Sequence, residues 1–586
     1  MTLHELGPAA IEGGFWAGRQ RLNRDVLIPD GERRLEAAGN LGNLRAAAGR
    51  SDERFRGMVF GDSDVYKWLE ALGHELAREP SPELSRMADE TIDLLAAAQC
   101  EDGYLNSYYQ VAKPGPRWSN LAWDHELYCA GHLFEAAAAH PHDERLLGVA
   151  RRFADLLVDV FRDAGTCGHP EAELGLVKLF RLTGERSYLE LAQAFVDRRG
   201  SAALEPATHG SSYFQNRVPV REQDEVEGHA VRALYLAAGV TDLYMETGEP
   251  ALLDAMHAQW RDMAGGKAYL TGGVGAHHTD EAFGDAYELP PDRCYGETCA
   301  AIASVLWNWR MLLVTGEARF ADLLERTLYN GVLAGLALDG GGYSYVNPLH
   351  VREGHRDPVE RGARRQPWYA CACCPPNVMR LLASLQRYVA TRDGDGVQIH
   401  QYATGTFGPV RVRTDYPWDG RVTVEVLEPG LSVSMRVPDW GSARLDGRPV
   451  KPGYVRLEHD TATLELDMTP RLVLPHPRID AVRGCAAIER GPLVYCLEAA
   501  DAPADTVVDD LRLTGGLEAV ARPDLLGGIV AVEADGAHAP ADRSEWPYTP
   551  DDRHNGGRPV RLLAVPYALW GNRGDGAMRV WVPRNS

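Results

Sequence analysis

The tripeptide Thr-Gly-Glu occurs three times in the central part of the chain, beginning at Thr183, Thr247 and Thr315. Each copy follows one run of apolar residues at helical spacing and precedes another. Glycine at such a position can adopt the left-handed conformation that closes a helix. The copies lie 64 and 68 residues apart, which is enough for a helical hairpin and a connecting loop. Stacked hairpins of this length predict an α-toroid, an (α/α) barrel or an α-solenoid, although the tripeptide could also be no more than a common helix cap.

Helical periodicity extends from about Pro82 to about Arg392 and gives way to strand patterning near Gly394. Apolar and polar residues then alternate in short runs, namely Val422, Val424 and Val426; Val433, Met435 and Val437; and Leu464, Leu466 and Met468. Glycine, proline and aspartate separate these runs. A period of two with such punctuation is typical of a β-sandwich or jelly-roll-like domain.

The chain has 586 residues, well above the size at which one hydrophobic core usually divides. We therefore predict a mainly α protein with β domains in three parts. Residues 1–392 form a helical domain, and residues 393–500 form a β-sandwich. Residues 501–586 form a second β-region, looser from Ala502 to Asn555, whose C-terminal strands return to pair with the first sandwich.

Charge and cysteine usage limit the partners and the compartment. Lys and Arg total 61 against 83 Asp and Glu, so the net charge is -22. This balance argues against nucleic acid and anionic membrane surfaces and suits a neutral substrate. The first residues, Met1 to Trp16, show no secretory pattern, and the ten cysteines do not form a disulfide framework. We therefore expect a cytoplasmic protein.

Two short segments together offer a carboxylate and up to four thiols. The first contains Glu297 and Cys299, and the second contains Cys371, Cys373 and Cys374 before a proline pair. This ligand set is soft enough for Zn²⁺, although Fe²⁺ or Co²⁺ could occupy such a site in vitro. A closed structural site is the commoner meaning of clustered cysteines, but a carboxylate ligand makes a catalytic site more credible. A metal-bound thiolate is also a ready nucleophile, and spacing alone does not rank the three clustered cysteines.

Carboxylates and histidines in nearby loops are candidates for acid–base chemistry and sugar binding. Glu281 and Glu288 lie in a segment without helical periodicity, and either could be a general acid or simply a solvated charge. His125, His169 and His229 each stand at the start of an apolar helical run. In a toroid such helix ends converge on one mouth, where polar and aromatic groups suit a sugar. A capping or core role is the alternative for each histidine.

Several segments together resemble glycoside hydrolase family 127, the β-L-arabinofuranosidases. They are Trp123 to His132, Val218 to Arg232, Glu281 to Cys299 and Cys373 to Asn377. The resemblance implies an (α/α)6 barrel catalytic domain followed by β-sandwich domains, and retaining hydrolysis by a zinc-bound cysteine.

Carried over to this sequence, the resemblance implies a role for each matching residue. Cys373 is the nucleophile and Glu281 is the general acid/base. The zinc ligands are Glu297, Cys299, Cys373 and Cys374. The sugar contacts are His125, His169, His229, Glu325 and Tyr345.

These expectations define one preferred function and two alternatives. The preferred one is an exo-acting glycosidase that releases β-L-arabinofuranose or a similar sugar from short oligosaccharides or glycoconjugates. The second is a sugar epimerase or lyase on an (α/α)6 barrel with a structural zinc, in which the histidines do the chemistry. The third is a non-catalytic carbohydrate-binding protein, which would need neither Glu281 nor the cysteine set. A homodimer formed through the β-sandwich region stays open.

Overall fold

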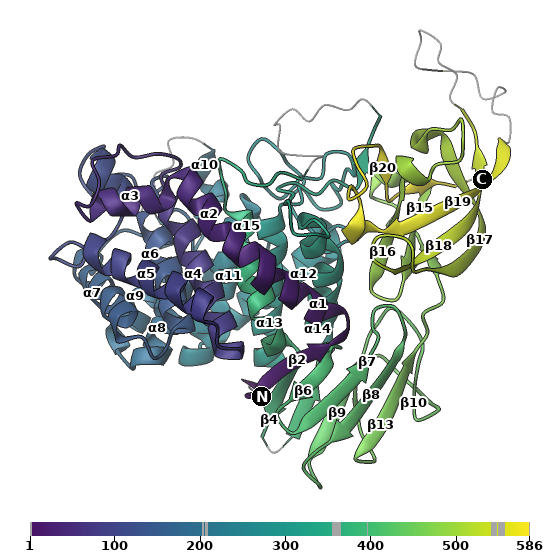
Figure 1. Ribbon diagram of the computed structural model, residues 1–586, viewed down its shortest axis with the longest axis horizontal. Helices are drawn as coiled ribbons and strands as arrows, with labels where there is room; N and C mark the ends of the chain where they lie inside the picture. The colour runs from purple at the N-terminus through teal and green to yellow at the C-terminus, as the bar shows by residue number, and fades with distance from the viewer. Residues whose placement is uncertain are drawn as a thin grey trace.

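The computed structural model describes residues 3–201, 204, 209–353, 365–394, 396–540, 548 and 557–584. A large helical domain stands beside two β-domains, one below the other in the view of Figure 1. The predicted fold class, a helical barrel followed by β-sandwich-like domains, is confirmed.

Six inner helices form a closed ring within the described residues. Each contacts the next along the chain, and the last contacts the first. They are α4 (Asp62–Arg78), α6 (Glu126–Ala139), α8 (Ala172–Thr183), α11 (Ala230–Thr247), α13 (Thr298–Thr315) and α15 (Cys374–Ala383). An outer helix packs on each, namely α5 (Pro82–Ala98), α7 (Glu144–Val160), α9 (Arg186–Asp197), α12 (Pro250–Asp262), α14 (Ala318–Arg326) and, on α15, α2 (Ile28–Ala38). This arrangement is an (α/α)6 barrel.

The Thr-Gly-Glu repeat marks the turn from an inner to an outer helix. Thr183, Thr247 and Thr315 are the last residues of α8, α11 and α13. The glycines that follow have left-handed φ values of 74°, 67° and 70°. Each glutamate then stands at the N-cap of the next outer helix. The tripeptide is therefore both a helix cap and the sign of a helical hairpin.

Helix α13 is long and apolar enough, by length and composition alone, to cross a membrane, but 89% of it is buried inside the structure. It is an inner helix of the barrel, and this position explains why most of its residues are apolar.

The first β-domain consists of two sheets that share one core. The five-stranded sheet has the order β1-β4-β5-β9-β12, and the seven-stranded sheet has the order β11-β10-β13-β8-β7-β6-β2. The alternating residues Val422, Val424, Met435 and Leu464 are all buried, as the period of two predicts. Strands β1 (His4–Glu5) and β2 (Ala9–Gly13) come from the N-terminus and pair with β4 (Ala390–Asp393) and β6 (Thr404–Phe407). The other strands are β5 (Gly396–Ile399), β7 (Val410–Thr414), β8 (Arg421–Val426), β9 (Ser432–Val437), β10 (Ala443–Leu445), β11 (Arg448–Val450), β12 (Gly453–Arg456) and β13 (Thr461–Leu466).

The second β-domain begins earlier than predicted. Its path runs β14-β15-β16-β19-β18-β17, with β3, β20 and β21 attached at the side. The strands are β14 (Arg471–Val473), β15 (Cys485–Arg490), β16 (Leu493–Glu498), β17 (Leu511–Arg522), β18 (Ile529–His538), β19 (Arg558–Pro566), β20 (Met578–Arg579), β21 (Val582–Pro583) and β3 (His350–Val351).

One correction to the predicted division follows from this pairing. The boundary between the β-domains lies near residue 470 instead of 500, because β14 to β16 belong with the later strands. The C-terminal strands β20 and β21 do return to pair with β16 and β15, which lie inside the predicted range 393–500 but belong to this second sheet. Part of the stretch predicted to be loose is the long hairpin β17–β18; residues 541–547 and 549–555 of it lie outside the described residues. Alternation marks a strand but does not identify its partner.

Candidate active site

The N-terminal ends of the inner helices meet at one mouth of the barrel and carry the site. His125, His229, Glu297 and Cys373 are the N-cap residues of α6, α11, α13 and α15. His169 precedes α8 by three positions. Unpaired backbone N–H groups and the helix dipoles favour negative charge at such ends, so thiolates and carboxylates are stabilised here.

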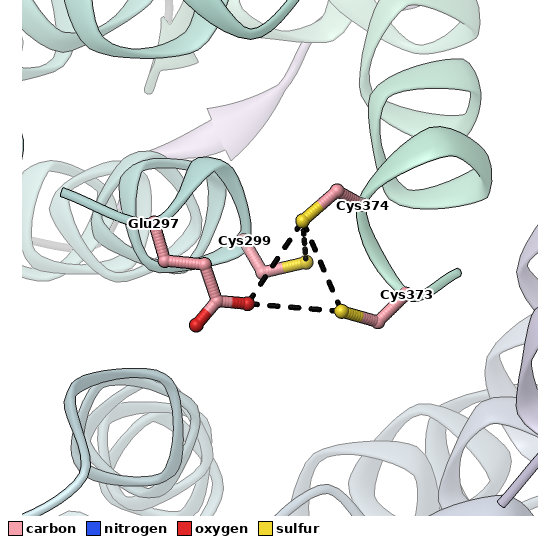
Figure 2. A group of neighbouring side chains, drawn as sticks. All are labelled: Glu297, Cys299, Cys373 and Cys374. Atoms are coloured by element: carbon pink, nitrogen blue, oxygen red, sulfur yellow. Dashed lines mark hydrogen bonds between the residues drawn. The ribbon is translucent and has the colours of Figure 1, made fainter. Parts of the chain in front are cut away.

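Four side chains from α13 and α15 form a compact group (Figure 2). The sulfur of Cys374 lies 3.3 Å from that of Cys299 and 3.8 Å from that of Cys373. Oε1 of Glu297 lies 3.7 Å from the Cys373 sulfur and 3.9 Å from the Cys374 sulfur. One ligand atom from each of the four residues falls within 4.8 Å of the others, so the group can hold a metal ion. The four predicted ligands are therefore brought together.

Local sequence fixes this geometry. Pro375 and Pro376 stand in the first turn of α15, where proline is preorganised for a helix start, and hold the cysteine pair at its tip. The hydroxyl of Thr298, between the two ligands on α13, donates to the Ser344 carbonyl at 2.7 Å. Its backbone N–H donates to the Tyr345 carbonyl at 3.0 Å. These bonds fasten the loop that brings Tyr345 to the site.

The group is acidic, and three of its four members are buried while Cys373 is half-buried. Burial, then the charges of Cys373 and Glu281, raise the pKa of Glu297 well above its usual range. Burial and the neighbouring thiols raise the pKa of Cys374. Burial also opposes ionisation of Cys299, but its hydrogen bonds with Cys373 and Cys374 lower the pKa of Cys299. Oε2 of Glu297 is buried and has no hydrogen-bond partner in the described part of the chain. Four acidic groups this close need shared protons or a cation to coexist.

The predicted acid/base, Glu281, is paired with a histidine. Nε2 of His229 lies 3.0 Å from Oε2 of Glu281. Since Nδ1 of His229 accepts the backbone N–H of Arg232 at 3.4 Å, the ring proton is on Nε2 and is donated to Glu281. Ligand atoms of His229, Glu281 and Glu297 also lie within 4.8 Å of one another. Glu297 therefore belongs both to the metal-binding group and to the acid–base pair.

The remaining predicted sugar contacts divide into two sets. The His169 ring lies 5.4 Å from the His125 ring and 5.8 Å from the His229 ring. Burial lowers the pKa of His125 to about 3 and that of His169 well below its usual value, so both rings are neutral. The Tyr345 hydroxyl lies 3.4 Å from the Cys373 sulfur. The structure thus brings His125, His169, His229 and Tyr345 to one site, while their contact with sugar stays a prediction.

The prediction of Glu325 as a sugar contact needs correction. Its carboxylate points into the contact between α14 and the first β-domain. It accepts hydrogen bonds from Tyr416 at 2.9 Å, from Arg436 at 2.6 Å and from Trp440 at 3.2 Å. Glu325 is only 1% exposed. Three donors occupy it, so it is a structural residue and not a sugar contact.

The two open candidates, Glu288 and Cys371, also have definite positions. Glu288 is 44% exposed and hydrogen-bonds to His277 at 3.0 Å, as a loop charge would. The sulfur of Cys371 lies 3.6 Å from the Tyr345 hydroxyl, beside the group of four but outside it.

Sequence reasoning assigned no role to Lys67 or to the residues that anchor α15. Nζ of Lys67 lies 3.4 Å from the carbonyl oxygen of Cys373. Asn377 donates to the Tyr235 hydroxyl at 2.9 Å, and Arg380 donates to Asn377 at 2.6 Å. Lys67 is 306 residues from Cys373 and Asn377 is 142 residues from Tyr235, so only the closed ring of helices reveals these two contacts.

The comparisons with known proteins cover nearly the whole chain. Residues 10–387 match the family model for the β-L-arabinofuranosidase GH127 catalytic domain, and residues 470–583 match the glycoside hydrolase family 127 C-terminal domain. The chain is 38% identical over 631 residues to the non-reducing end β-L-arabinofuranosidase of Bifidobacterium longum subsp. longum, with 96% of this chain and 95% of that protein covered.

Solved structures agree with this assignment. A GH127 β-L-arabinofuranosidase from Geobacillus stearothermophilus T6 is 37% identical with a TM-score of 0.91, covering 98% of this chain and 100% of that one. A further GH127 β-arabinofuranosidase is 32% identical with a TM-score of 0.90, covering 100% of this chain and 98% of that one. With both domain models matched and its relatives covered almost end to end, the chain belongs to glycoside hydrolase family 127 and is a glycosidase.

Proposed function

We propose that this glycosidase releases β-L-arabinofuranose from the non-reducing end of short oligosaccharides or glycoconjugates with retention of configuration. Cys373 is the nucleophile and Glu281 is the general acid/base. The observation that carries the proposal is the shared position of Glu297, which lies beside Cys373 in one cluster and beside Glu281 in the other. The names of the relatives support the choice of sugar.

We propose zinc as the metal, held by Glu297, Cys299, Cys373 and Cys374. A tetrahedral site with Zn–S bonds of about 2.3 Å places its sulfur atoms about 3.8 Å apart and sulfur and oxygen about 3.6 Å apart. The Cys373–Cys374 sulfur distance of 3.8 Å and the sulfur–oxygen distances of 3.7 and 3.9 Å are near these values, whereas the Cys299–Cys374 sulfur distance of 3.3 Å is shorter. When bound, zinc would keep the Cys373 thiol ionised at neutral pH.

In the first half-reaction the Cys373 sulfur attacks the anomeric carbon. The bond from that carbon to the leaving oxygen breaks, and protonated Glu281 gives its proton to that oxygen. The product is a glycosyl thioether on Cys373, and Glu281 is left as a carboxylate. His229 donates a hydrogen bond to this carboxylate and holds it in place.

In the second half-reaction Glu281 takes a proton from water, whose oxygen attacks the anomeric carbon on the face left by the aglycone. The carbon–sulfur bond breaks and Cys373 returns to the thiolate. Two displacements at one carbon give net retention. Neutral His125 and His169, with the Tyr345 hydroxyl, would provide hydrogen bonds to the sugar hydroxyls.

The same chemistry favours a reducing compartment. All ten cysteines are unpaired, and three of them must stay reduced to bind metal. We propose a cytoplasmic location for this reason. No observation favours an epimerase or a lyase, because the three histidines lie beside the cysteine group and do not form a separate proton-transfer pair.

The test is hydrolysis of p-nitrophenyl β-L-arabinofuranoside, with zinc content measured on every variant. We expect the wild type to turn over, and Cys373→Ser to lose at least 1000-fold, on the order expected for loss of a nucleophile. Cys100→Ser, which alters a thiol outside the site, is the matched control. An active Cys373→Ser enzyme would contradict the mechanism.

A second variant separates the two half-reactions. Because p-nitrophenolate leaves without help from an acid, Glu281→Gln should release about one equivalent quickly and then stall. Intact-protein mass should show one pentose on the enzyme, and digestion should place it on Cys373. A labelled residue other than Cys373 would reassign the nucleophile.

A further inference from the structure

Lys67 is a buried cation beside the candidate metal centre, on the helix that lies next to α15 in the ring. It lies on α4 and is 0% exposed. Its Nζ is 3.4 Å from the carbonyl oxygen of Cys373 and 3.1 Å from Oδ1 of Asp64. It also lies 5.8 Å from the centre of the Tyr128 ring, which places a polarisable face beneath the charge.

The net charge of the proposed zinc site explains what a buried lysine can do at the position of Lys67. Three thiolates and a carboxylate carry four negative charges, and a divalent ion offsets two of them. The remaining negative charge is buried, where electrostatic interactions are stronger than in water. Lys67 is close enough to offset part of it, while Asp64, 3% exposed, reduces this effect.

The hydrogen bond adds a geometric effect. The carbonyl that Lys67 contacts belongs to the N-cap residue of α15, at the point where the chain turns into the helix. A fixed cation here holds the backbone of Cys373 and therefore the direction of its side chain.

We propose that Lys67 is a positioning residue for Cys373. Lys67 anchors the backbone of Cys373 and offsets the negative charge of the metal–thiolate group, and Asp64 reduces the effect of the Lys67 charge. The inference rests on the proposed zinc site. The competing view is that Lys67 and Asp64 are simply a buried ion pair that stabilises α4.

The two views predict different signs for the effects of two substitutions on metal binding. If Lys67 acts through its charge, Lys67→Met removes a favourable cation, whereas Asp64→Asn leaves that cation less compensated. The two substitutions should then change metal binding in opposite directions. If the pair is only structural, breaking it from either side should weaken the site in the same direction.

The experiment uses the full chain loaded with metal and measures the zinc dissociation constant by chelator competition. We expect Lys67→Met to weaken zinc binding by roughly 10- to 100-fold, the usual effect of losing a partner behind the ligands. Asp64→Asn should bind zinc more tightly than the wild type. In the Co²⁺-substituted proteins the thiolate-to-metal band should move to longer wavelength in Lys67→Met and to shorter wavelength in Asp64→Asn.

Each possible result either supports or overturns the inference about Lys67. Equal zinc affinity in wild type and Lys67→Met, or equal or weaker binding in Asp64→Asn, would overturn the inference. If Lys67→Met fails to fold, the sign of the Asp64→Asn effect still decides. A wild type that binds no zinc would remove the zinc proposal and this inference with it, whereas a zinc-binding wild type with unaltered variants would remove the inference alone.

Discussion

Nε2 of His229 donates a hydrogen bond to Oε2 of Glu281 over 3.0 Å, across two segments joined by backbone bonds. The N–H of Ala230 donates to the carbonyl of Glu281 at 3.0 Å, and that of Phe283 donates to the carbonyl of Gly228 at 2.9 Å. Glu281 itself has a left-handed φ of 57°, which is uncommon for a residue other than glycine. The surrounding bonds hold this conformation, so the carboxylate is aimed before substrate arrives.

We expect His229→Ala to lower kcat by about 10- to 100-fold, since the acid/base loses its positioning partner. The loss should be larger for a natural disaccharide than for the p-nitrophenyl glycoside, because only the former needs its leaving group protonated. His229→Gln, which keeps an N–H donor, should recover part of the rate. Equal losses on both substrates, with no recovery by glutamine, would contradict this role.

Removal of the metal by a chelator should abolish activity and lower the thermal unfolding midpoint. A ligand that binds only the folded state stabilises it by about 4 kcal/mol at a thousand times its dissociation constant. Added Zn²⁺ should restore both properties. Cys374→Ala, which lacks one ligand, is the control and should show little response to the chelator. A metal-free wild type with full activity would disprove metal-assisted catalysis.

Glu325→Gln should destabilise the protein without changing the chemistry. The substitution removes one of the two carboxylates that pair with the buried Arg436, the other being Asp322, and breaking a buried ion pair costs up to about 3–5 kcal/mol. We expect a lower unfolding midpoint with kcat and KM unchanged at low temperature. A selective rise in KM would instead restore Glu325 as a sugar contact.

Stability should fall as the pH is lowered from about 6.5, the ordinary histidine pKa in an unfolded chain. Burial, then Arg436, lowers the pKa of His400 in the folded protein to about 3. Between these values the unfolded chain binds a proton that the folded chain does not, so acid favours unfolding. The stability contribution is complete above pH 6.5 and declines by at most about 1.4 kcal/mol per pH unit for each such histidine.

His400→Gln tests this dependence away from the active site. The His400 ring is buried in the first β-domain, with Nε2 2.7 Å from the Thr391 hydroxyl. The free energy of unfolding, measured with urea between pH 4 and 7, should change less with pH in the variant than in the wild type. The same change with pH in both proteins would show that His400 does not contribute.

The sequence predicted those features that local spacing controls. The Thr-Gly-Glu turns and the alternating strands depend on neighbouring residues, and the metal-binding group needs only two short segments, at Glu297 and at Cys373. Strand partners depend on tertiary packing, so the place of β14 to β16 was missed. Glu325 was misassigned because the resemblance carried a role to a glutamate whose surroundings only the β-domain contact defines. Lys67 was missed because its partner, Cys373, is 306 residues away along the chain and comes close only where α15 packs against α4 to close the barrel.

The first strands of the chain have a consequence for modular exchange of the barrel. Strands β1 and β2 precede the helices but pair with β4 and β6, which follow them, so the sandwich encloses both ends of the helical domain (Figure 1). A fragment ending at Ala383 would leave two unpaired strand edges, which are sites of aggregation. Recombination that transplants this barrel into another protein must therefore carry its sandwich with it.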